Sequence, residues 1–273
     1  MTRSIKQAPW LVLLAMLLAF SLAPFDWMLV ASLKPGDQQL ISGNPWWADN
    51  PYWANYTDLL TSHTFQLWLA NTALVLISTL AISLVASLLA GYALAYMNLP
   101  YSRGIVAALF ATYLLPQGVL FLPLVSMLSG LHLLNSPLAL ILTYPSLVIP
   151  FGTWVLWSFF RALPRDLVDQ ASVEGAHTVD MLLRVVGPLA APALAAVLLF
   201  GLAIVFNDYF YAFAFVSDES AQTLVAAVGS TSVDISDSGF LFAAITIGVA
   251  PVAVVCAFFA DVYARGLGAG VID

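Results

Sequence analysis

QLWLANTALVLISTLAISLVASLLAGYALAYM, the stretch from Gln66 to Met97, contains no charged residue. A helix that crosses a bilayer needs about 20 mainly apolar residues. This run is longer than that, so a helix built from it can cross the membrane with some tilt or extend past it. The stretch therefore predicts a membrane-spanning helix rather than a helix of a soluble core.

The composition of the whole chain agrees with a membrane location. Hydrophobic residues make up 62% of the 273 residues and charged residues only 8%, whereas a soluble domain averages about 25% charged residues. The eight Lys and Arg residues are too few for a nucleic-acid-binding surface. We predict an all-α polytopic membrane protein made of one domain, 1–273. Its six transmembrane helices are predicted at 8–31, 66–96, 105–129, 137–160, 189–216 and 240–264.

Basic residues predict the orientation of such a bundle, because they accumulate in cytoplasmic loops. If the N-terminus is inside, all but one of the eight basic residues are cytoplasmic. The cytoplasmic residues are then Arg3, Lys6, Arg103, Arg161, Arg165, Arg184 and Arg265, and Lys34 is outside. We therefore expect a multi-pass protein of the cytoplasmic (inner) membrane with both termini in the cytoplasm.

Residues 161–188 form a polar segment between the fourth and fifth predicted spans. Arg165–Glu174 contains no helix breaker, and Gly175 fits the left-handed position that ends a helix. Thr178 is a candidate N-cap for a second helix, and Pro188 begins the fifth span. The segment is thus predicted to be a cytoplasmic helix-turn-helix. It is either an ordinary amphipathic loop or, because small residues line its surface, a docking site for another protein.

The pattern Asp169-x-Ala171-x-x-Glu174-Gly175-Ala176, with Pro188 behind it, resembles the EAA motif of the membrane subunits of bacterial binding-protein-dependent ABC importers. Gly187 departs from that motif, which has an apolar residue before the proline. Other segments resemble the carbohydrate-uptake branch: SLKP (32–35), ANYTDLL (54–60), GYALAY (91–96), LPQGVLFLPL (115–124) and FNDYFYAF (206–213). Together they are similar to the shorter, six-span permease of maltose, trehalose and glycerol-phosphate importers.

This resemblance implies a coupling role for the hairpin, which would fit a groove on a separate ATPase subunit. The residues carried over to that contact are Asp169, Ala171, Glu174, Gly175, Ala176 and Pro188. In the lipid bilayer a second permease subunit would complete a heterodimer. Two ATPase subunits would bind from the cytoplasm, and an extracytoplasmic binding protein would deliver a sugar or related solute. A permease for another solute, such as a polyamine or glycerol phosphate, remains an alternative.

The chain itself lacks a phosphate-binding loop. A Walker A loop needs Gly-Lys-Ser/Thr, because backbone amides and the lysine hold the phosphates. Lys6 follows Ile5 and Lys34 follows Leu33, so neither lysine fits. We expect a transport subunit that is not an enzyme and has no cofactor of its own, with ATP and Mg²⁺ bound by the partner ATPase.

Polar residues near the hydrocarbon region are costly and so are candidates for function. The clearest are Asn207 and Asp208, late in the fifth predicted span, and Asp26, late in the first. They either lie hydrated at the membrane interface, or line the translocation pathway or its outer gate.

Two other classes fit the sequence less well. A self-sufficient secondary transporter is expected to show internal repeats and intramembrane ion ligands, and no convincing repeat is visible. A membrane enzyme needs a cluster of catalytic residues, whereas the three His residues are scattered and form no metal-binding pattern.

Overall fold

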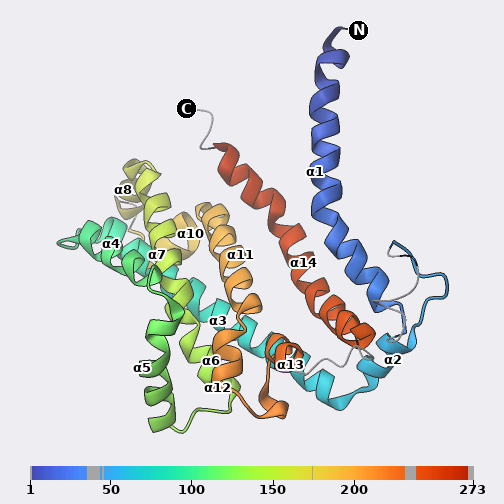
Figure 1. Cartoon of the computed structure of the whole chain (residues 1–273). Helices are drawn as coiled ribbons and strands as arrows, with labels where there is room; N and C mark the ends of the chain where they lie inside the picture. Colours follow the sequence, from blue (N-terminus) through green and yellow to red (C-terminus); the bar gives the residue numbers. More distant parts are fainter. Residues whose placement is uncertain (1, 36–43, 45, 174, 231–237, 270–273) are drawn as a thin grey trace. The chain divides into compact units, whose positions relative to one another are not determined.

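A computed structural model describes residues 2–35, 44, 46–173, 175–230 and 238–269. All regular secondary structure in these ranges is helical, as the composition predicts (Figure 1). The first half contains α1 (Thr2–Ser32), α2 (Ala54–Thr61), α3 (His63–Tyr96), α4 (Ser102–Tyr113), α5 (Gln117–Gly130), α6 (Pro137–Thr143) and α7 (Pro145–Ala162). The second half contains α8 (Arg165–Val173), α9 (Thr178–Asp180), the π-helix η2 (Met181–Val186), α10 (Gly187–Leu189), α11 (Ala191–Asn207), α12 (Phe210–Phe215), the 3₁₀-helix η3 (Glu219–Ala221), α13 (Leu224–Ser230) and α14 (Ser238–Ala269).

Four helical stretches among the described residues are long and apolar enough to cross a membrane. They are Trp10–Ser32, His63–Tyr96, Pro137–Ala162 and Ser238–Val262, and they match the first, second, fourth and sixth predicted spans. Two bent helix pairs would raise the number to six if each pair forms one span. Long uninterrupted apolar runs were therefore a sound guide to these four spans.

The third predicted span, 105–129, is not one continuous helix. The axes of α4 and α5 meet at an angle of 91°. Pro116 lies at this break with φ −59° and ψ 135°. Proline has no N–H to donate and disfavours a helical residue before it, so the helix ends here and a new one starts. The prediction of one continuous span at 105–129 was therefore wrong.

The fifth predicted span, 189–216, is also interrupted. Helix α11 has 17 residues and ends at Asn207, and Asp208 then adopts an extended conformation with ψ 110° before α12 begins. A helix of this length spans about 26 Å at 1.5 Å per residue, less than the roughly 30 Å of a hydrocarbon core. At its other end, α11 is bent by 78° from the helical segment Thr178–Leu189. The prediction of a single continuous span here was wrong.

The chain divides into two compact units, one made of Met1–Gln66 and Ser230–Pro251, the other of Leu67–Gly229 and Val252–Asp273. The single domain predicted from the sequence stays a prediction. In the first unit, the side-chain amide of Asn55 donates to the carbonyl oxygens of Ser32 and Lys34, at 2.9 and 3.0 Å. The hydroxyls of Ser32 and Tyr56 lie 2.5 Å apart. These bonds join the SLKP and ANYTDLL segments, which the sequence presents as separate motifs.

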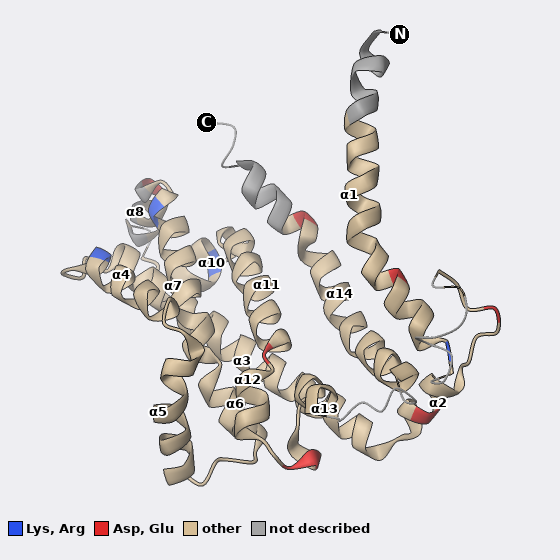
Figure 2. Ribbon diagram, viewed as in Figure 1, with Lys and Arg blue, Asp and Glu red and all other residues tan. Residues whose placement is uncertain are grey.

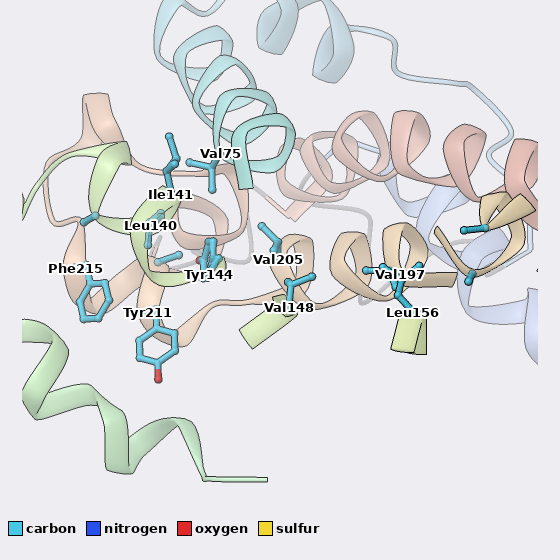
Figure 3. Close-up of a cluster of buried hydrophobic side chains, with 14 of the residues drawn as sticks. Val75, Leu140, Ile141, Tyr144, Val148, Leu156, Val197, Val205, Tyr211 and Phe215 are labelled. Carbon is cyan, nitrogen blue, oxygen red and sulfur yellow. The ribbon is translucent and has the colours of Figure 1, made fainter. Parts of the chain in front are cut away.

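The second unit is built around one buried hydrophobic cluster (Figure 3). Its members come mainly from α3, α6, α7, α11, α12 and the 161–188 hairpin, with Leu128 of α5 and Ala226 of α13. They include Val75, Leu140, Tyr144, Val148, Leu156, Val197, Tyr211 and Phe215. Helix α7 packs against both α4 and α11. Glycines allow the closest crossings, because a Cβ at Gly152 would lie 2.5 Å from Ser87 Oγ, and one at Gly201 would lie 2.7 Å from Leu80 Cδ2. Small residues permit such close approach between membrane helices.

Candidate functional site

The 161–188 hairpin begins with α8 and turns at Gly175. This glycine has φ 86°, in the left-handed region, as predicted. The amide of Ala176 donates to the carbonyl oxygen of Ala171 at 3.0 Å and closes the turn. A residue with a Cβ is strained at such a φ, and this explains why glycine stands where the helix ends.

The second half of the hairpin differs from the predicted regular helix. The N-cap is His177, with extended backbone angles of φ −75° and ψ 163°, so the prediction of Thr178 as the cap was wrong by one residue. Three residues later the helix widens into the π-helix Met181–Val186. A Cβ at Gly187 would lie only 2.3 Å from the carbonyl oxygen of Leu182. The wide turn therefore requires glycine where the EAA motif has an apolar residue.

The residues carried over from the EAA motif divide into two groups. Ala171 and Ala176 are partly buried and pack against the core cluster of the second unit. Gly175 and Pro188 are exposed. Glu174 and the side chain of Asp169 lie outside the described part of the structure.

The exposed face of the hairpin carries apolar side chains that the sequence analysis did not single out. They are Leu167, Val173, Val179 and Leu183, with Val173 88% exposed. Exposed apolar residues grouped on a segment between spans are typical of a surface that another protein covers. Beside them, Arg184 Nε lies 3.5 Å from Asp180 Oδ1 in a solvent-exposed ion pair, which contributes little to stability. In the sequence these residues are visible as apolar side chains in the segment between the fourth and fifth predicted spans.

Asp208, one of the three candidate pathway residues, lies in a buried hydrogen-bonded cluster. Its side chain is 7% exposed. Its Oδ2 accepts a hydrogen bond from the Tyr144 hydroxyl at 2.9 Å, and two more from the backbone amides of Tyr211 at 3.0 Å and Ala212 at 3.3 Å. The carboxylate therefore satisfies the first turn of α12 and binds the junction of α6 and α7 at the same time.

Tyr144 and Tyr211 were missed by sequence reasoning. Tyr144 is fully buried between α6 and α7. The Tyr211 hydroxyl donates to the backbone carbonyl oxygen of Gln117, at the start of α5, at 2.8 Å. Tyr211 lies within the FNDYFYAF segment (206–213) but was not singled out there, and only the fold brings Tyr144 to Asp208.

The other two polar candidates do not join this cluster. Asn207 is exposed, and its side-chain amide donates to the carbonyl oxygen of Ala203 one turn earlier, at 2.8 Å. Asp26 is exposed on α1, which belongs to the first unit. The structure thus separates Asp208, which is enclosed, from two residues whose side chains are open to their surroundings.

The start of α3 is tied to the turn that carries Asp218 and Glu219. The indole of Trp68 donates to the Glu219 carbonyl oxygen at 2.9 Å. The Asn71 amide donates to the carbonyl oxygens of Ser220 and Gln222, at 2.9 and 3.1 Å. Within the turn, hydrogen bonds from the Ser220 hydroxyl and amide lower the pKa of Asp218. Trp68 and Asn71 thus hold this acidic turn against the start of α3.

Comparison with known families agrees with this architecture. The model of the family described as "Binding-protein-dependent transport system inner membrane component" matches residues 83–268. The chain belongs to this family. The matched range contains the hairpin, α11 and the Asp208 cluster, so the features described above lie inside the region that defines the transport component. Its members are membrane components of transport systems rather than enzymes.

Relatives of this transport component extend over nearly its whole length. The sulfoquinovosyl glycerol transport system permease protein SmoH of Agrobacterium fabrum is 32% identical, over 94% of this chain and 90% of SmoH. The diacetylchitobiose uptake system permease protein NgcG of Streptomyces coelicolor is 31% identical, over 87% of this chain and 80% of NgcG. The trehalose/maltose transport system permease protein MalG of Thermococcus litoralis is 27% identical, over 96% of this chain and 95% of MalG.

A solved structure has the same fold as this transport component. A chain from the crystal structure of a bacterial ABC transporter involved in the import of the acidic polysaccharide alginate matches with a TM-score of 0.78. The two chains are 19% identical, and the match covers 95% of this chain and 97% of the other. Because the match covers nearly all of both chains, the helical fold of this chain is that of an ABC importer membrane component.

Proposed function

We propose that this chain is one of two membrane subunits of an ATP-driven importer and forms half of the pathway for a sugar or related solute. The observation that carries the proposal is the hairpin between α7 and α11, with its glycine turn and exposed apolar face. The relatives named above are permeases for sulfoquinovosyl glycerol, diacetylchitobiose and trehalose or maltose, and all of these solutes contain a sugar. This common property supports a carbohydrate as the solute class.

ATP hydrolysis, in this proposal, belongs to separate ATPase subunits that also hold the Mg²⁺. The hairpin would fit a groove on one of them, with Gly175 and its neighbours at the contact. The exposed side chains of Leu167, Val173 and Val179 would be covered there. The physical role of the hairpin is then to convert closure of the ATPase pair into movement of α7 and α11.

The hairpin side of the second unit is proposed to be cytoplasmic. The basic residues of α4, α7 and η2 lie toward one end of this unit, and the acidic turn after α12 lies toward the other (Figure 2). Positive residues favour the cytoplasmic side, and this supports an orientation with both termini inside. The opposite side would receive the solute from an extracytoplasmic binding protein. One crystal structure shows an alginate transporter with a periplasmic protein bound to alginate pentasaccharide.

The test is co-purification of the ATPase with variants of the hairpin. Gly175→Val is expected to release the ATPase or abolish ATP-driven uptake, because the new side chain is strained at φ 86° and stands between the docked surfaces. The strain alone amounts to about 1 kcal/mol or more. Glu174→Lys is expected to act in the same direction by reversing charge at the contact. The membrane bundle should still insert and pair with the second permease.

Two control variants accompany the test. A Cβ at Gly104, in α4, would meet no atom within 4 Å, so Gly104→Val controls for adding a branched side chain to a loosely packed glycine. Arg103→Gln controls for charge in the other cytoplasmic loop. Wild-type ATPase retention and uptake in Gly175→Val would show that 161–188 is only a connecting loop.

The alternatives make different predictions. A secondary transporter would accumulate solute in proteoliposomes without ATP or a cytosolic partner. A permease for polyamines or glycerol phosphate would require ATP but would release a different solute from the purified, solute-loaded complex. Identifying the bound solute by mass spectrometry separates these cases.

A further inference from the structure

The two helices that flank the hairpin are joined to each other at both ends. At one end the hairpin itself connects the last residue of α7, Ala162, to the first residue of α11, Ala191. At the other end, Tyr144 precedes α7 and Asp208 follows α11, and the Tyr144 hydroxyl donates to Asp208 Oδ2 at 2.9 Å. Helix α7, the hairpin and α11 therefore form a closed loop of structure.

The bond that closes this loop is enclosed by protein. Tyr144 is 1% exposed and belongs to the core cluster, in which Val148 and Val205 are its neighbours along α7 and α11 (Figure 3). A buried carboxylate in a membrane protein is costly unless its oxygens accept hydrogen bonds. The side chains of Tyr144 and Gln117 both hydrogen-bond to Asp208, so opening the loop at Tyr144 would remove one of two side-chain donors from that carboxylate.

The same cluster also reaches α5. Tyr211 donates its amide to Asp208 Oδ2 and its hydroxyl to the carbonyl oxygen of Gln117, the first residue of α5. Aromatic contacts strengthen this connection, because Phe121 of α5 stacks on Phe215 of α12 with ring centroids 6.0 Å apart. Two helix breaks, at 114–116 and at Asp208–Tyr209, and the junction of α6 and α7 at Tyr144 are thus joined by a short series of hydrogen bonds.

We propose that Asp208 is a positioning residue that closes α7, the hairpin and α11 into one lever, and that Tyr211 passes the movement of this lever to α5. The inference rests on the proposed coupling role of the hairpin. A lever closed at both ends turns as one body, so movement imposed at the hairpin reaches the far ends of α7 and α11 together. Asp208 then acts through its hydrogen bonds and not as a charge that contacts solute.

The experiment measures solute taken up per ATP hydrolysed, in proteoliposomes that contain the complete importer and its binding protein. Tyr144→Phe removes the bond that closes the lever, and Tyr211→Phe removes the bond to α5 while leaving its amide on Asp208. Each variant is expected to lower the ratio by about three- to tenfold, the factor for one interhelical hydrogen bond in a membrane protein. ATPase co-purification should stay at the wild-type level. Tyr209→Phe is the matched control, because the Tyr209 side chain is exposed and its hydroxyl only contacts the Gly229 carbonyl oxygen at 3.4 Å.

A second pair of variants separates positioning from a charged pathway residue. The bonds from Tyr144, Tyr211 and Ala212 all end on Asp208 Oδ2, so the amide oxygen of Asp208→Asn can accept them, whereas Asp208→Ala loses them together with the bond to the Gln117 side chain. Positioning predicts that Asp208→Asn keeps more of the uptake-to-ATP ratio than Asp208→Ala. Equal losses in these two variants, or a wild-type ratio in both Tyr144→Phe and Tyr211→Phe, would overturn the inference. If wild-type chain fails to retain the ATPase, the proposed function itself is wrong, and that result is read from co-purification alone.

Discussion

At the scale of single residues, the hairpin has two positions that require glycine, and only one of them can be recognised from the sequence. Gly175 follows a helix of polar residues, and this pattern is enough to predict its left-handed backbone, which the structure confirms. No sequence pattern around Gly187 indicates that this position requires glycine. Its requirement comes from the carbonyl oxygen of Leu182, which the π-helix brings to within 2.3 Å of a Cβ at this position.

Gly187→Ala should therefore destabilise the hairpin, because either the wide turn or the following helix must shift. An overpacked site typically costs about 1–3 kcal/mol. The expected result is a lower unfolding temperature in detergent and faster proteolysis within 161–188. Gly118→Ala is the control, since a Cβ there meets nothing within 4 Å. Identical melting curves for the two variants would contradict the close approach.

In the candidate site, too, only some of the residues could be identified from the sequence. Asp208 could be selected because a carboxylate among apolar residues is conspicuous. Its partners Tyr144 and Tyr211 could not, because their roles depend on the ends of helices meeting in space. The exposed apolar residues of the hairpin, such as Val173 and Leu183, were visible in the sequence, but their exposure was not.

At the scale of helices, the close crossing of α3, α7 and α11 depends on a glycine, which has no side chain. A Cβ at Gly152 would lie 2.5 Å from Ser87 Oγ and 2.9 Å from Val197 Cγ1. All three helices must then move apart to accept even one methyl group. The predicted spans located these helices correctly, but hydropathy contains no information on which faces touch.

Gly152→Ala is expected to lower the free energy of unfolding in detergent by about 1–3 kcal/mol through overpacking. Adding Ser87→Gly should recover part of that loss, because it removes two of the atoms that a new Cβ would meet. The unfolding temperatures of the two single variants and the double variant measure this coupling. Strictly additive effects would argue that the two helices are not in contact at this point.

At the scale of the whole molecule, the sequence locates the long apolar helices better than it predicts their continuity. Four spans are continuous helical stretches, as their uninterrupted apolar runs indicate. The third and fifth are not, because Pro116 and Asp208 end helices within runs that remain hydrophobic on average. Mean hydropathy over a window of residues does not detect such breaks, because the segments on both sides are equally apolar.

The orientation can be tested with single cysteines in a Cys256→Ala background. Cys256 is exposed in α14 and would otherwise react. In sealed right-side-out vesicles, Ser217→Cys is expected to react with an impermeant thiol reagent, whereas His177→Cys should react only after the membrane is opened. Both native side chains are exposed in the structure, so access to the reagent decides the outcome. Labelling of His177→Cys in intact vesicles would reverse the assignment.

The π-helix at Met181–Val186 also affects how the chain tolerates a change of length. A π turn holds one residue more than an α turn, so this segment contains a spare residue relative to an ordinary helix. Loss of one residue there can be absorbed by a return to α-helical bonding, with α11 keeping its direction. The same loss within α3 would rotate every later residue of that helix by about 100°, because a full turn holds 3.6 residues. The buried glycine and serine positions of α3 would then turn away from α7. Deletions should therefore be far less damaging in one short stretch of the hairpin than in the apolar helix that defines the fold.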